Sequence, residues 1–427
     1  MAVCAVIGGG AGGMMAAGQL GAAGIETLLF EPNTRLGAKL RITGKGRCNL
    51  TNACDVRQFI DKVVTNKKFL FGAANRFSPN DCIAFFENNL GVKLKIERGG
   101  RVFPEDDNAH TVANALEKYA LAHAKYIQSR VTAIEARKDG FLIKTENGDY
   151  NADNILIATG GMSYPKTGST GDGYGFARTL GHIVTPLRAS LVPLVCAEDL
   201  CRDLQGLSLK NTGLKLFIEG VKKPVYEEQG ELLFTHFGVS GPLILSASAH
   251  LGDETVIRAG GAQALMDAGK IKISLDLKPA LDEERLDARI LRDFAEEPNR
   301  DFKNSLSALL PSKMIMPIVK LSGIPGDTKI NAVTAEQRKK LVRLLKDLRL
   351  TVTGTRPIDE AVVTSGGVDV REVDPVTMES KIVKNLFFAG EVLDLDAYTG
   401  GYNLQIAFST AVAAARAIIN QNSGEVK

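Results

Sequence analysis

The N-terminal hydrophobic pattern predicts a strand, a glycine turn, a helix and a second strand. Ala2–Ile7 is a short continuous apolar run that ends in GGGAGG, as expected of a strand buried on both faces. Met14–Ala23 is rich in alanine and favours a helix, which Gly24 can terminate before Ile25–Phe30 resumes as a strand. This order predicts a βαβ unit.

From Val131 to Ile157 the pattern changes to short β-type runs. Asp139-Gly140 and Asn147-Gly148 interrupt them, and both dipeptides are typical of hairpin turns. We therefore expect an antiparallel meander. It leads into ILIATGGMSYP at 155–165, which predicts a buried strand followed by a turn of small residues.

The middle of the chain, from about Leu187 to Thr353, has a third pattern. Its first part contains β-type segments with Pro and Gly breaks, which predict a small β domain. From Leu281 to Leu348 apolar residues recur at helical spacing, which predicts helices. One predicted helix carries basic residues that fit a solvated face better than a nucleic-acid contact. They are Arg338, Lys339, Lys340, Arg343, Lys346 and Arg349.

The C-terminal pattern returns the chain to the first sheet. Leu386–Ala389 is a short apolar strand, and the alanine-rich segment Leu404–Ile419 predicts a helix. In a doubly wound sheet this strand places Gly390 and Glu391 at the carboxyl edge, beside the crevice where such sheets bind cofactors.

Composition narrows the class of protein. A chain of 427 residues with 44% hydrophobic and 24% charged residues is typical of a globular protein with two or three domains. The net charge of +3 is too small to indicate a polyanion partner, and neither a signal peptide nor a membrane-spanning run is evident, so we expect a cytoplasmic protein. The six cysteines have no metal-site spacing, and we expect reduced thiols.

The first glycine turn carries the most specific chemistry. Gly8, Gly10 and Gly13 fit G-x-G-x-x-G between strand and helix, and Glu31 closes the second strand where an acid can bind a ribose. Gly8 permits the tight turn, Gly10 lets a pyrophosphate approach the backbone, and Gly13 lets helix and strand pack. The pattern predicts dinucleotide binding; the alternative is a glycine-rich turn with a surface glutamate.

TGKGRCNLTN, residues 43–52, has three interpretations. The glycine-flanked lysine suggests a phosphate cradle, the Arg47-Cys48 pair an activated thiol, and the Asn and Thr residues a tight turn. The phosphate role already belongs to GGGAGG, and no apolar strand of its own precedes this stretch. We therefore interpret it as a loop beside the cofactor, in which Cys48 is either an acid or small filler.

Six sequence blocks, in order, resemble the YhiN/BaiN-like flavoproteins, also called aminoacetone-oxidase-like FAD enzymes. The resemblance spans nearly the whole chain. It implies an α/β fold of the glutathione-reductase type: a Rossmann-like FAD domain at 1–187 and 354–427, an inserted β-barrel-like substrate domain at 188–280 and an inserted helical domain at 281–353. The blocks are GGGAGG (8–13), GKGRCNLTN (44–52), GRVFP (100–104), ATGGMSYPKTGSTGDGYGFA (158–177), ELLFTHFGVSGP (231–242) and AGEVLDLDAYTGGYNLQIA (389–407).

The resemblance also implies which residues meet FAD. The first turn and Glu31 would hold the adenosine and pyrophosphate side, Val131 the adenine, Gly390 and Glu391 the ribityl chain, and the start of the last helix the flavin ring. For Asn403 a plain helix cap is the alternative. The implied positions are Gly8, Gly10, Ala11, Gly12, Gly13, Glu31, Lys39, Gly44, Arg47, Cys48, Asn49, Val131, Thr159, Gly160, Gly161, Gly390, Glu391, Asn403 and Leu404.

Flavin chemistry requires a placed substrate carbon and a proton donor rather than a nucleophile. Members of the resembled family act on uridine in ribosomal RNA, on 3-oxo bile acids or on small amines. We favour reduction of an activated C=C bond, with NADH or NADPH as external reductant, over oxidation of an amine such as aminoacetone. A ribosomal-RNA-associated protein with structural FAD and a flavin-dependent methylene transferase on RNA are further alternatives.

The substrate is accordingly a small molecule or ribosomal RNA, and the sequence leaves the oligomeric state open. His236 is a candidate proton donor, although its flanking phenylalanines equally suit a partly buried histidine. The candidate catalytic residues are Arg47, Cys48, His236, Tyr398 and Tyr402.

Overall fold

A computed structural model describes residues 2–423. The chain divides into two compact units. The first comprises the residues up to Ser190 and those from Ile358 onward, and the second comprises Leu191–Pro357.

The first unit contains a five-stranded parallel sheet in the order β19-β10-β1-β2-β6. The order reverses at β1, because the chain proceeds from β1 to β2 on one side and reaches β10 on the other side only later. The predicted βαβ unit and doubly wound arrangement are confirmed. The strands are β1 (Val3–Ile7), β2 (Glu26–Phe30), β6 (Lys125–Ile127), β10 (Asn154–Ile157) and β19 (Leu386–Phe388).

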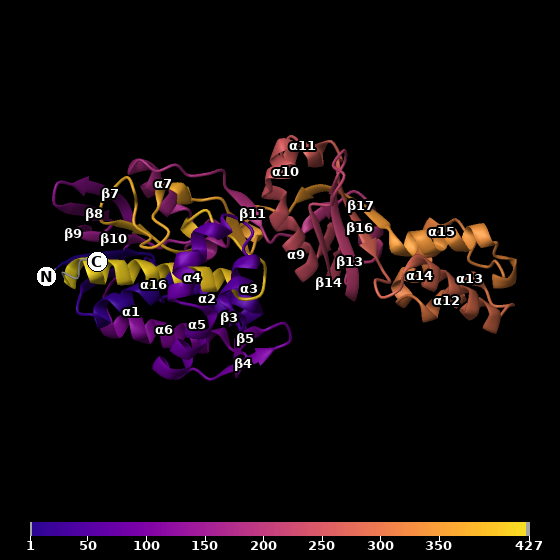
Figure 1. Cartoon of the computed structure of the whole chain (residues 1–427), viewed down its shortest axis with the longest axis horizontal. Helices are drawn as coiled ribbons and strands as arrows, with labels where there is room; N and C mark the ends of the chain where they lie inside the picture. The colour runs from indigo at the N-terminus through magenta and orange to yellow at the C-terminus, as the bar shows by residue number, and fades with distance from the viewer. Residues whose placement is uncertain (1, 424–427) are drawn as a thin grey trace. The chain divides into compact units, whose positions relative to one another are not determined.

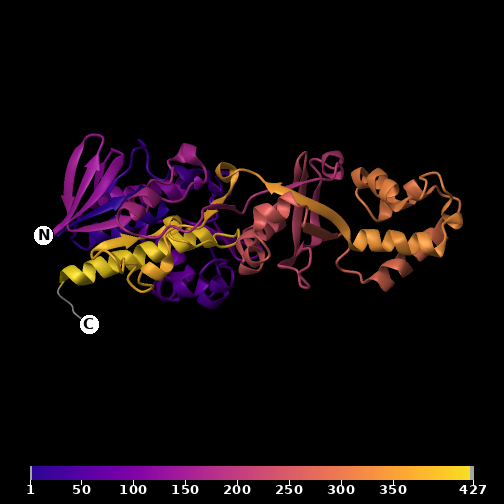
Figure 2. The ribbon, with the colours of Figure 1, turned by 90° about the horizontal axis from the view of Figure 1, so that it is seen from above.

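Small residues of α1 allow α6 to pack closely against it (Figure 1). A Cβ added at Gly18 of α1 would lie 2.2 Å from the Tyr119 ring of α6, and one at Gly21 would lie 1.8 Å from the His123 carbonyl oxygen. α1 also packs along α16, which Figure 2 shows in yellow beside the sheet. These helices are α1 (Ala11–Ala22), α6 (Ala109–His123) and α16 (Tyr402–Ser423).

Smaller sheets complete the first unit. The predicted meander is confirmed: β7, β8 and β9 form an antiparallel sheet, and Gly140 and Gly148 adopt positive φ at its two turns. Its strands are β7 (Val131–Arg137), β8 (Gly140–Thr145) and β9 (Gly148–Ala152). The other strands are β3 (Thr51–Asn52), β4 (Leu94–Glu97), β5 (Arg101–Pro104), β11 (Arg188–Ser190) and β18 (Val363–Ser365), and the other α-helices are α2 (Ala38–Ile42), α3 (Val56–Asp61), α4 (Phe71–Arg76), α5 (Pro79–Ala84) and α7 (Asp172–Thr179).

The second unit contains a closed barrel in the order β12-β15-β14-β13-β16-β17. Side chains of β16 alternate between buried and half-buried, as the pleat of a barrel strand requires. The predicted inserted β-barrel is confirmed. Its strands are β12 (Leu194–Cys196), β13 (Ser208–Ile218), β14 (Tyr226–Thr235), β15 (Gly238–Ser240), β16 (Ile271–Asp276) and β17 (Leu348–Thr355).

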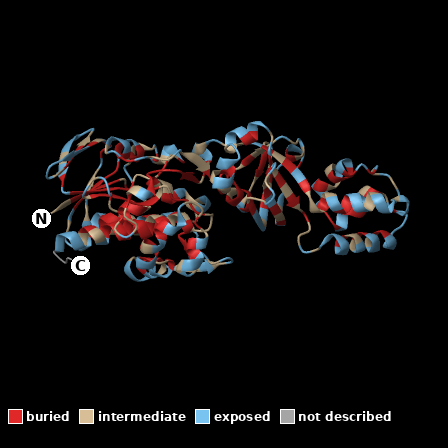
Figure 3. Cartoon of the chain, turned by 45° about the horizontal axis from the view of Figure 1, so that its top comes forward, coloured by how far each residue is buried: buried red, intermediate tan, exposed pale blue. Residues whose placement is uncertain are grey.

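Helices make up most of the rest of the second unit. Those between Glu283 and Lys346 lie where the spacing of apolar residues predicts helices, whereas those between Leu200 and Asp267 lie in the segment predicted as a small β domain. Figure 3 shows that their outer faces are exposed and their inner faces buried. The separation of 281–353 as a third domain stays a prediction. The helices are α8 (Leu200–Asp203), α9 (Pro242–Ala249), α10 (Glu254–Arg258), α11 (Ala262–Asp267), α12 (Glu283–Glu296), α13 (Phe302–Ser305), α14 (Ser312–Ser322) and α15 (Ala335–Lys346).

The basic helix predicted near the end of this unit is α15. Ion pairs neutralise part of its charge and that of the residues directly after it. These pairs join Arg338 to Asp287, Lys346 to Asp276 and Arg349 to Asp347. Across residues 2–423, none of the helices has the length and apolar character that a membrane crossing needs.

Candidate functional site

The candidate site begins where the turns after β1 and β10 meet at the carboxyl edge of the sheet. Ile7 and Ile157 are paired at the ends of these strands. Gly8 has φ +106°, and a Cβ there would lie 2.6 Å from the Ala158 carbonyl oxygen. A Cβ at Gly13 would lie 1.8 Å from the carbonyl oxygen of Gly8. Both glycines are therefore required by close backbone approach. The turn lies at the switch point of the sheet, because β2 and β10 flank β1 on opposite sides.

Gly10 differs from its neighbours because the space beside it is open. A Cβ added there would meet no atom within 4 Å. Gly10 is the N-cap of α1 and offers no side-chain cap to the helix. The first turn of α1 therefore presents backbone N–H groups and the positive end of the helix dipole toward open space. Residues Gly10, Ala11 and Gly12 fit the pyrophosphate of a dinucleotide.

Glu31 follows β2 and orders the same turn. Its Oε2 accepts a hydrogen bond from Gly9 N at 2.8 Å, and its Oε1 accepts from Asn33 N at 3.0 Å and Nδ2 at 2.7 Å. Oε2 retains a lone pair, so the predicted contact with a ribose hydroxyl remains chemically available. Asn33, two residues after Glu31, thus holds the Glu31 carboxylate in place, and the G-x-G-x-x-G motif does not specify this residue.

Two buried hydroxyl groups near the predicted cofactor positions have no partner. Thr159 Oγ1 and Ser129 Oγ are enclosed and form no hydrogen bond among the described residues. Thr159 lies in the turn after β10, and Ser129 lies two residues before Val131, which is buried at the start of β7. A buried hydroxyl group without a partner carries a desolvation cost. Because both oxygens are already enclosed by the protein, they do not add to the case for a cofactor contact. Gly160, with φ +74°, continues the turn at Thr159.

A polar cluster lies beside this turn, and we call Lys39, Ser163, Thr364 and Glu391 the Lys39 cluster. Lys39 Nζ lies 2.6 Å from Ser163 Oγ and 2.7 Å from Glu391 Oε2. Glu391 Oε1 accepts from Ser163 Oγ at 3.1 Å and from Thr364 N at 2.9 Å. A Cβ at Gly161 would lie 2.5 Å from Thr364 Oγ1, so glycine is required there. Sequence reasoning missed Ser163 and Thr364, although Ser163 lies within the ATGGMSYP block.

Arg47 pairs with two acidic side chains. Its guanidinium group forms ion pairs with Glu97 and Asp107 and lies 4.2 Å from the centroid of the Phe103 ring. These partners hold the Arg47 charge on the β4–β5 hairpin side of the TGKGRCN segment. The structure therefore shows two acidic partners for Arg47, and its contact with flavin or substrate stays a prediction.

Cys48 fits the filler interpretation. Its side chain is fully buried, and its backbone adopts φ 58° at the end of the TGKG turn, where Gly44 has the same angle. Burial raises the pKa of the Cys48 thiol to about 12. A thiol in that environment stays protonated and shielded at neutral pH, so the neighbouring arginine does not activate it.

Two asparagines fix the loop that precedes α16. With its amide oriented to satisfy both groups, Asn49 donates to Thr51 O at 3.1 Å and accepts from Gly401 N at 3.2 Å. Asn403 accepts from Ala397 N at 3.0 Å and donates to Ala397 O at 2.8 Å. Both side chains therefore bind backbone. Asn403 and Leu404 can reach a flavin ring through the backbone at the start of α16, and that contact stays a prediction.

The remaining candidate donors lie in different surroundings. Tyr402 is buried with its ring stacked on Phe59 at 6.3 Å, which makes it part of the core. Tyr398 is half-buried, and Lys62 Nζ lies 5.6 Å from the centroid of its ring. His236 belongs to the second unit, where it is exposed in the turn between β14 and β15 and its ring packs against Phe237.

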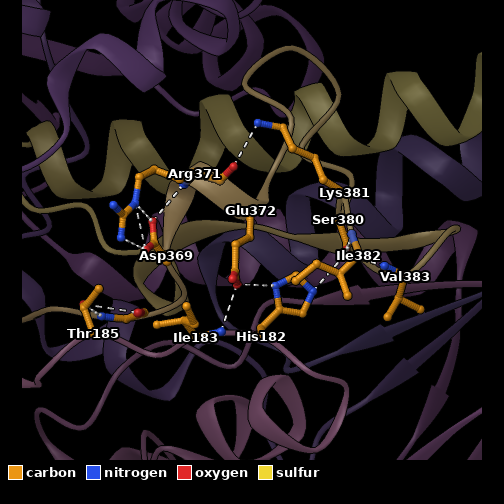
Figure 4. Close-up of polar contacts among 11 residues, drawn as sticks. His182, Ile183, Thr185, Asp369, Arg371, Glu372, Ser380, Lys381, Ile382 and Val383 are labelled. Atoms are coloured by element: carbon orange, nitrogen blue, oxygen red, sulfur yellow. Dashed lines mark hydrogen bonds and ion pairs between the residues drawn. The ribbon is translucent and has the colours of Figure 1, made fainter.

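A second cluster of polar residues in the first unit contains a serine, a histidine and a glutamate that contact one another in the order found in a Ser-His-Glu catalytic triad (Figure 4). Ser380 Oγ lies 2.8 Å from His182 Nε2, and His182 Nδ1 lies 3.3 Å from Glu372 Oε2. Ser380 Oγ also accepts the backbone N–H groups of Ile382 and Val383 at 3.0 and 2.8 Å. The serine hydroxyl therefore donates to Nε2, and the histidine proton lies on Nδ1.

Burial excludes a nucleophilic role for this group. The His182 side chain is 0% exposed and Ser380 is 7% exposed, so a substrate has no access to Oγ. The two backbone N–H groups also occupy the Oγ lone pairs that would attack. The arrangement instead links the segment at 182–183 to the segment at 372–383.

This link predicts a pH-dependent stability. Burial lowers the pKa of His182, because desolvation disfavours the imidazolium. The unfolded chain therefore binds the proton more readily than the folded chain does. The stabilising contribution of His182 is thus present above its unfolded pKa of about 6.5 and is lost as pH falls through its lower folded pKa.

His182→Gln should lower the free energy of unfolding by about 1–2 kcal/mol at neutral pH. The difference from wild type, measured by urea unfolding, should shrink toward about pH 5. A constant difference would contradict the assignment.

Comparison with known proteins gives whole-chain matches. The family described as the HI0933-like protein Rossmann domain matches residues 2–417. The chain is 30% identical over 420 residues to the 3-dehydro-bile acid delta(4,6)-reductase of Clostridium scindens, covering 96% of this chain and 98% of that protein. It is also 30% identical to the ribosomal RNA dihydrouridine synthase of Escherichia coli, covering 98% of each. The crystal structure of 3-ketosteroid delta1-dehydrogenase from Sterolibacterium denitrificans shares the fold, with a TM-score of 0.50, 12% identity and coverage of 99% of this chain and 100% of that one.

Proposed function

Because this chain belongs to the HI0933-like Rossmann family, we propose that it is an FAD-dependent reductase that delivers hydride to an activated C=C bond. The family and the Rossmann fold predicted from the sequence are both confirmed. One observation carries the proposal: two whole-length relatives with different substrates both have names that describe saturation of a ring double bond. A shared reaction across unlike substrates favours a reductase over an amine oxidase.

The residues at the carboxyl edge fit the proposed cofactor. The open first turn of α1 suits the pyrophosphate, and Glu31 suits the adenosine ribose. When reduced, FAD supplies a hydride to a substrate carbon. The protein's task is to hold the acceptor, exclude water and provide a proton for the second carbon.

The exposure of the candidate residues indicates which of them can donate that proton to a substrate. Cys48 and Tyr402 are buried, and the charge of Arg47 is taken up by carboxylates. Tyr398 and His236 retain the exposure that a donor to substrate needs, and we propose them as the candidates to test. The substrate is either a small enone such as a 3-oxo bile acid or uridine in ribosomal RNA. NADH or NADPH is the proposed reductant, and the cytoplasm is the proposed location.

The proposal predicts the behaviour of the flavoprotein in single-turnover experiments. Anaerobic NADH or NADPH should bleach the flavin absorbance, and a C=C acceptor should then restore it faster than oxygen does. The acceptors to compare in parallel are an enone steroid, unmodified ribosomal RNA and oxygen, and aminoacetone is offered separately to the oxidised flavoprotein as an electron donor.

Each outcome has a distinct meaning. Reoxidation by the steroid or by the RNA identifies the substrate class. A flavin that aminoacetone reduces and oxygen reoxidises, with no response to either C=C acceptor, would replace the reductase by an oxidase. Failure of both nicotinamides to bleach the flavin would remove them as reductants. If Tyr398 or His236 donates the proton, Tyr398→Phe or His236→Ala will slow the acceptor half-reaction while leaving the FAD absorbance intact.

A further inference from the structure

Basic side chains are unevenly distributed over the helices of the second unit. α12 has five acidic and three basic residues, whereas α15 has five basic residues and one acidic residue. α14 has two lysines and no acidic residue. α15 contacts both α12 and α14 (Figure 1). The positive charge of these helices is therefore concentrated on α14 and α15.

Ion pairs divide the basic residues of α15 into two sets. Arg338 and Lys346 each pair with an aspartate, and the side chain of each is only 15% exposed. The other set is exposed, and within the described span 2–423 its members form no ion pair: Lys339, Lys340 and Arg343. The half-buried basic residues of α15 are thus neutralised, whereas the exposed ones retain their charge.

α14 extends this uncompensated charge. Lys320 is exposed in its last turn and has no ion-pair partner in the part of the chain that the structure describes. Lys340 reaches the end of α14, because its Nζ lies 3.2 Å from where a Cβ added at Gly323 would be. Met316 and Leu321 of α14 are 59% and 45% exposed. We define the α14–α15 face as Met316, Lys320, Leu321, Lys339, Lys340 and Arg343.

The chemistry of the α14–α15 face fits the phosphates of a nucleic acid better than a lipid surface. Lysine and arginine bind phosphate oxygens, and the planar guanidinium group of Arg343 can also stack on an unpaired base. A helix that lies on a membrane needs a broad apolar face. Most of the apolar side chains of α14 are instead buried within the unit, among them Met314, Ile318 and Val319.

We propose that the α14–α15 face binds the phosphate backbone of an RNA substrate. The inference rests on the proposed function and selects RNA over a small enone, since a bile acid or a steroid has no polyanionic backbone. For Lys339, Lys340 and Arg343 it replaces the interpretation as a solvated face. The residues of the candidate cofactor site belong to the first unit, so the face can be altered without changing them.

Filter binding of an unmodified ribosomal RNA transcript to the FAD-loaded protein, over a range of salt concentrations, tests the proposal. The face variant is Lys320→Gln/Lys339→Gln/Arg343→Gln, which removes three positive charges. It should weaken RNA binding on the order of 100-fold at about 0.1 M salt. The slope of log affinity against log salt should also become shallower by about 2–3, which loss of helix stability alone would not produce.

A matched control removes the same charge elsewhere in the second unit. It replaces three exposed arginines, each of which already pairs with an acid, and it should leave RNA affinity within about threefold. The control variant is Arg258→Gln/Arg285→Gln/Arg292→Gln. Comparison of the two variants therefore separates the α14–α15 face from the net charge of the protein.

Three results would overturn the inference. They are a face variant with wild-type affinity and salt slope, a control variant that loses as much affinity, and tighter binding to vesicles of equal parts phosphatidylglycerol and phosphatidylcholine than to RNA. Failure of the proposed function is distinguishable. A wild type that reduces an enone steroid but binds no RNA overturns the inference alone. A wild type that binds RNA through this face but saturates no C=C bond overturns the proposed function alone.

Discussion

Replacement of Gly10 by alanine is expected to weaken FAD binding by at least about 100-fold while the apoprotein stays folded. The added Cβ would meet no protein atom within 4 Å, and φ −76° at Gly10 is allowed for alanine. The methyl group would instead occupy the space into which the first turn of α1 presents its N–H groups. Isothermal titration of the apoprotein with FAD measures the loss, and urea unfolding of the apoprotein measures its stability.

Gly13 provides the contrast for this prediction. A Cβ there would lie 1.8 Å from the Gly8 carbonyl oxygen, so Gly13→Ala should destabilise the apoprotein itself. Gly10→Ala should therefore lose cofactor without losing stability, and Gly13→Ala should lose both. If Gly10→Ala binds FAD as the wild type does, the pyrophosphate does not lie at this turn.

The first turn could be predicted from the sequence because its chemistry is local. Gly8, Gly10, Gly13 and Glu31 lie within one βαβ unit, so spacing alone indicates their roles. The structure adds physical reasons that differ for each position: backbone collision at Gly8 and Gly13, and open space at Gly10. The meander and the barrel were also predictable, because turn dipeptides and Pro or Gly breaks punctuate their strands.

Side-chain partners far apart in sequence could not be predicted in this way. Lys39 and Glu391 are separated by 352 positions, and only the fold brings them together. Arg47 and Cys48 were plausible chemical groups when only their sequence neighbours were considered. Arg47 is neutralised by Glu97 and Asp107, acids that the TGKGRCN motif does not contain, and burial keeps Cys48 protonated. Sequence motifs therefore predict where the cofactor site lies, but long-range pairing determines which side chains there carry an uncompensated charge or an accessible proton.

The TGKGRCNLTN segment and the loop before α16 approach each other closely at Gly401. Gly401 has φ +91°, and a Cβ there would lie 2.4 Å from Thr51 O. Gly401 N also reaches the side chain of Asn49 at 3.2 Å. This contact connects the segment first interpreted as a flavin-side loop to the start of the helix predicted to face the flavin ring. Close approach at Gly401 thus couples the two parts of the proposed cofactor pocket.

Gly401→Ala is therefore expected to lower the free energy of unfolding by about 4 kcal/mol, from the strain of a positive φ together with a backbone collision. Gly46→Ala isolates the first effect, because Gly46 has φ +85° but no atom within 4 Å of an added Cβ. It should cost only about 1–2 kcal/mol. Urea unfolding of both apoproteins measures the difference, which reports the close approach alone. Equal losses would show that the segments separate without cost, and Gly401 would then have no part in holding the pocket together.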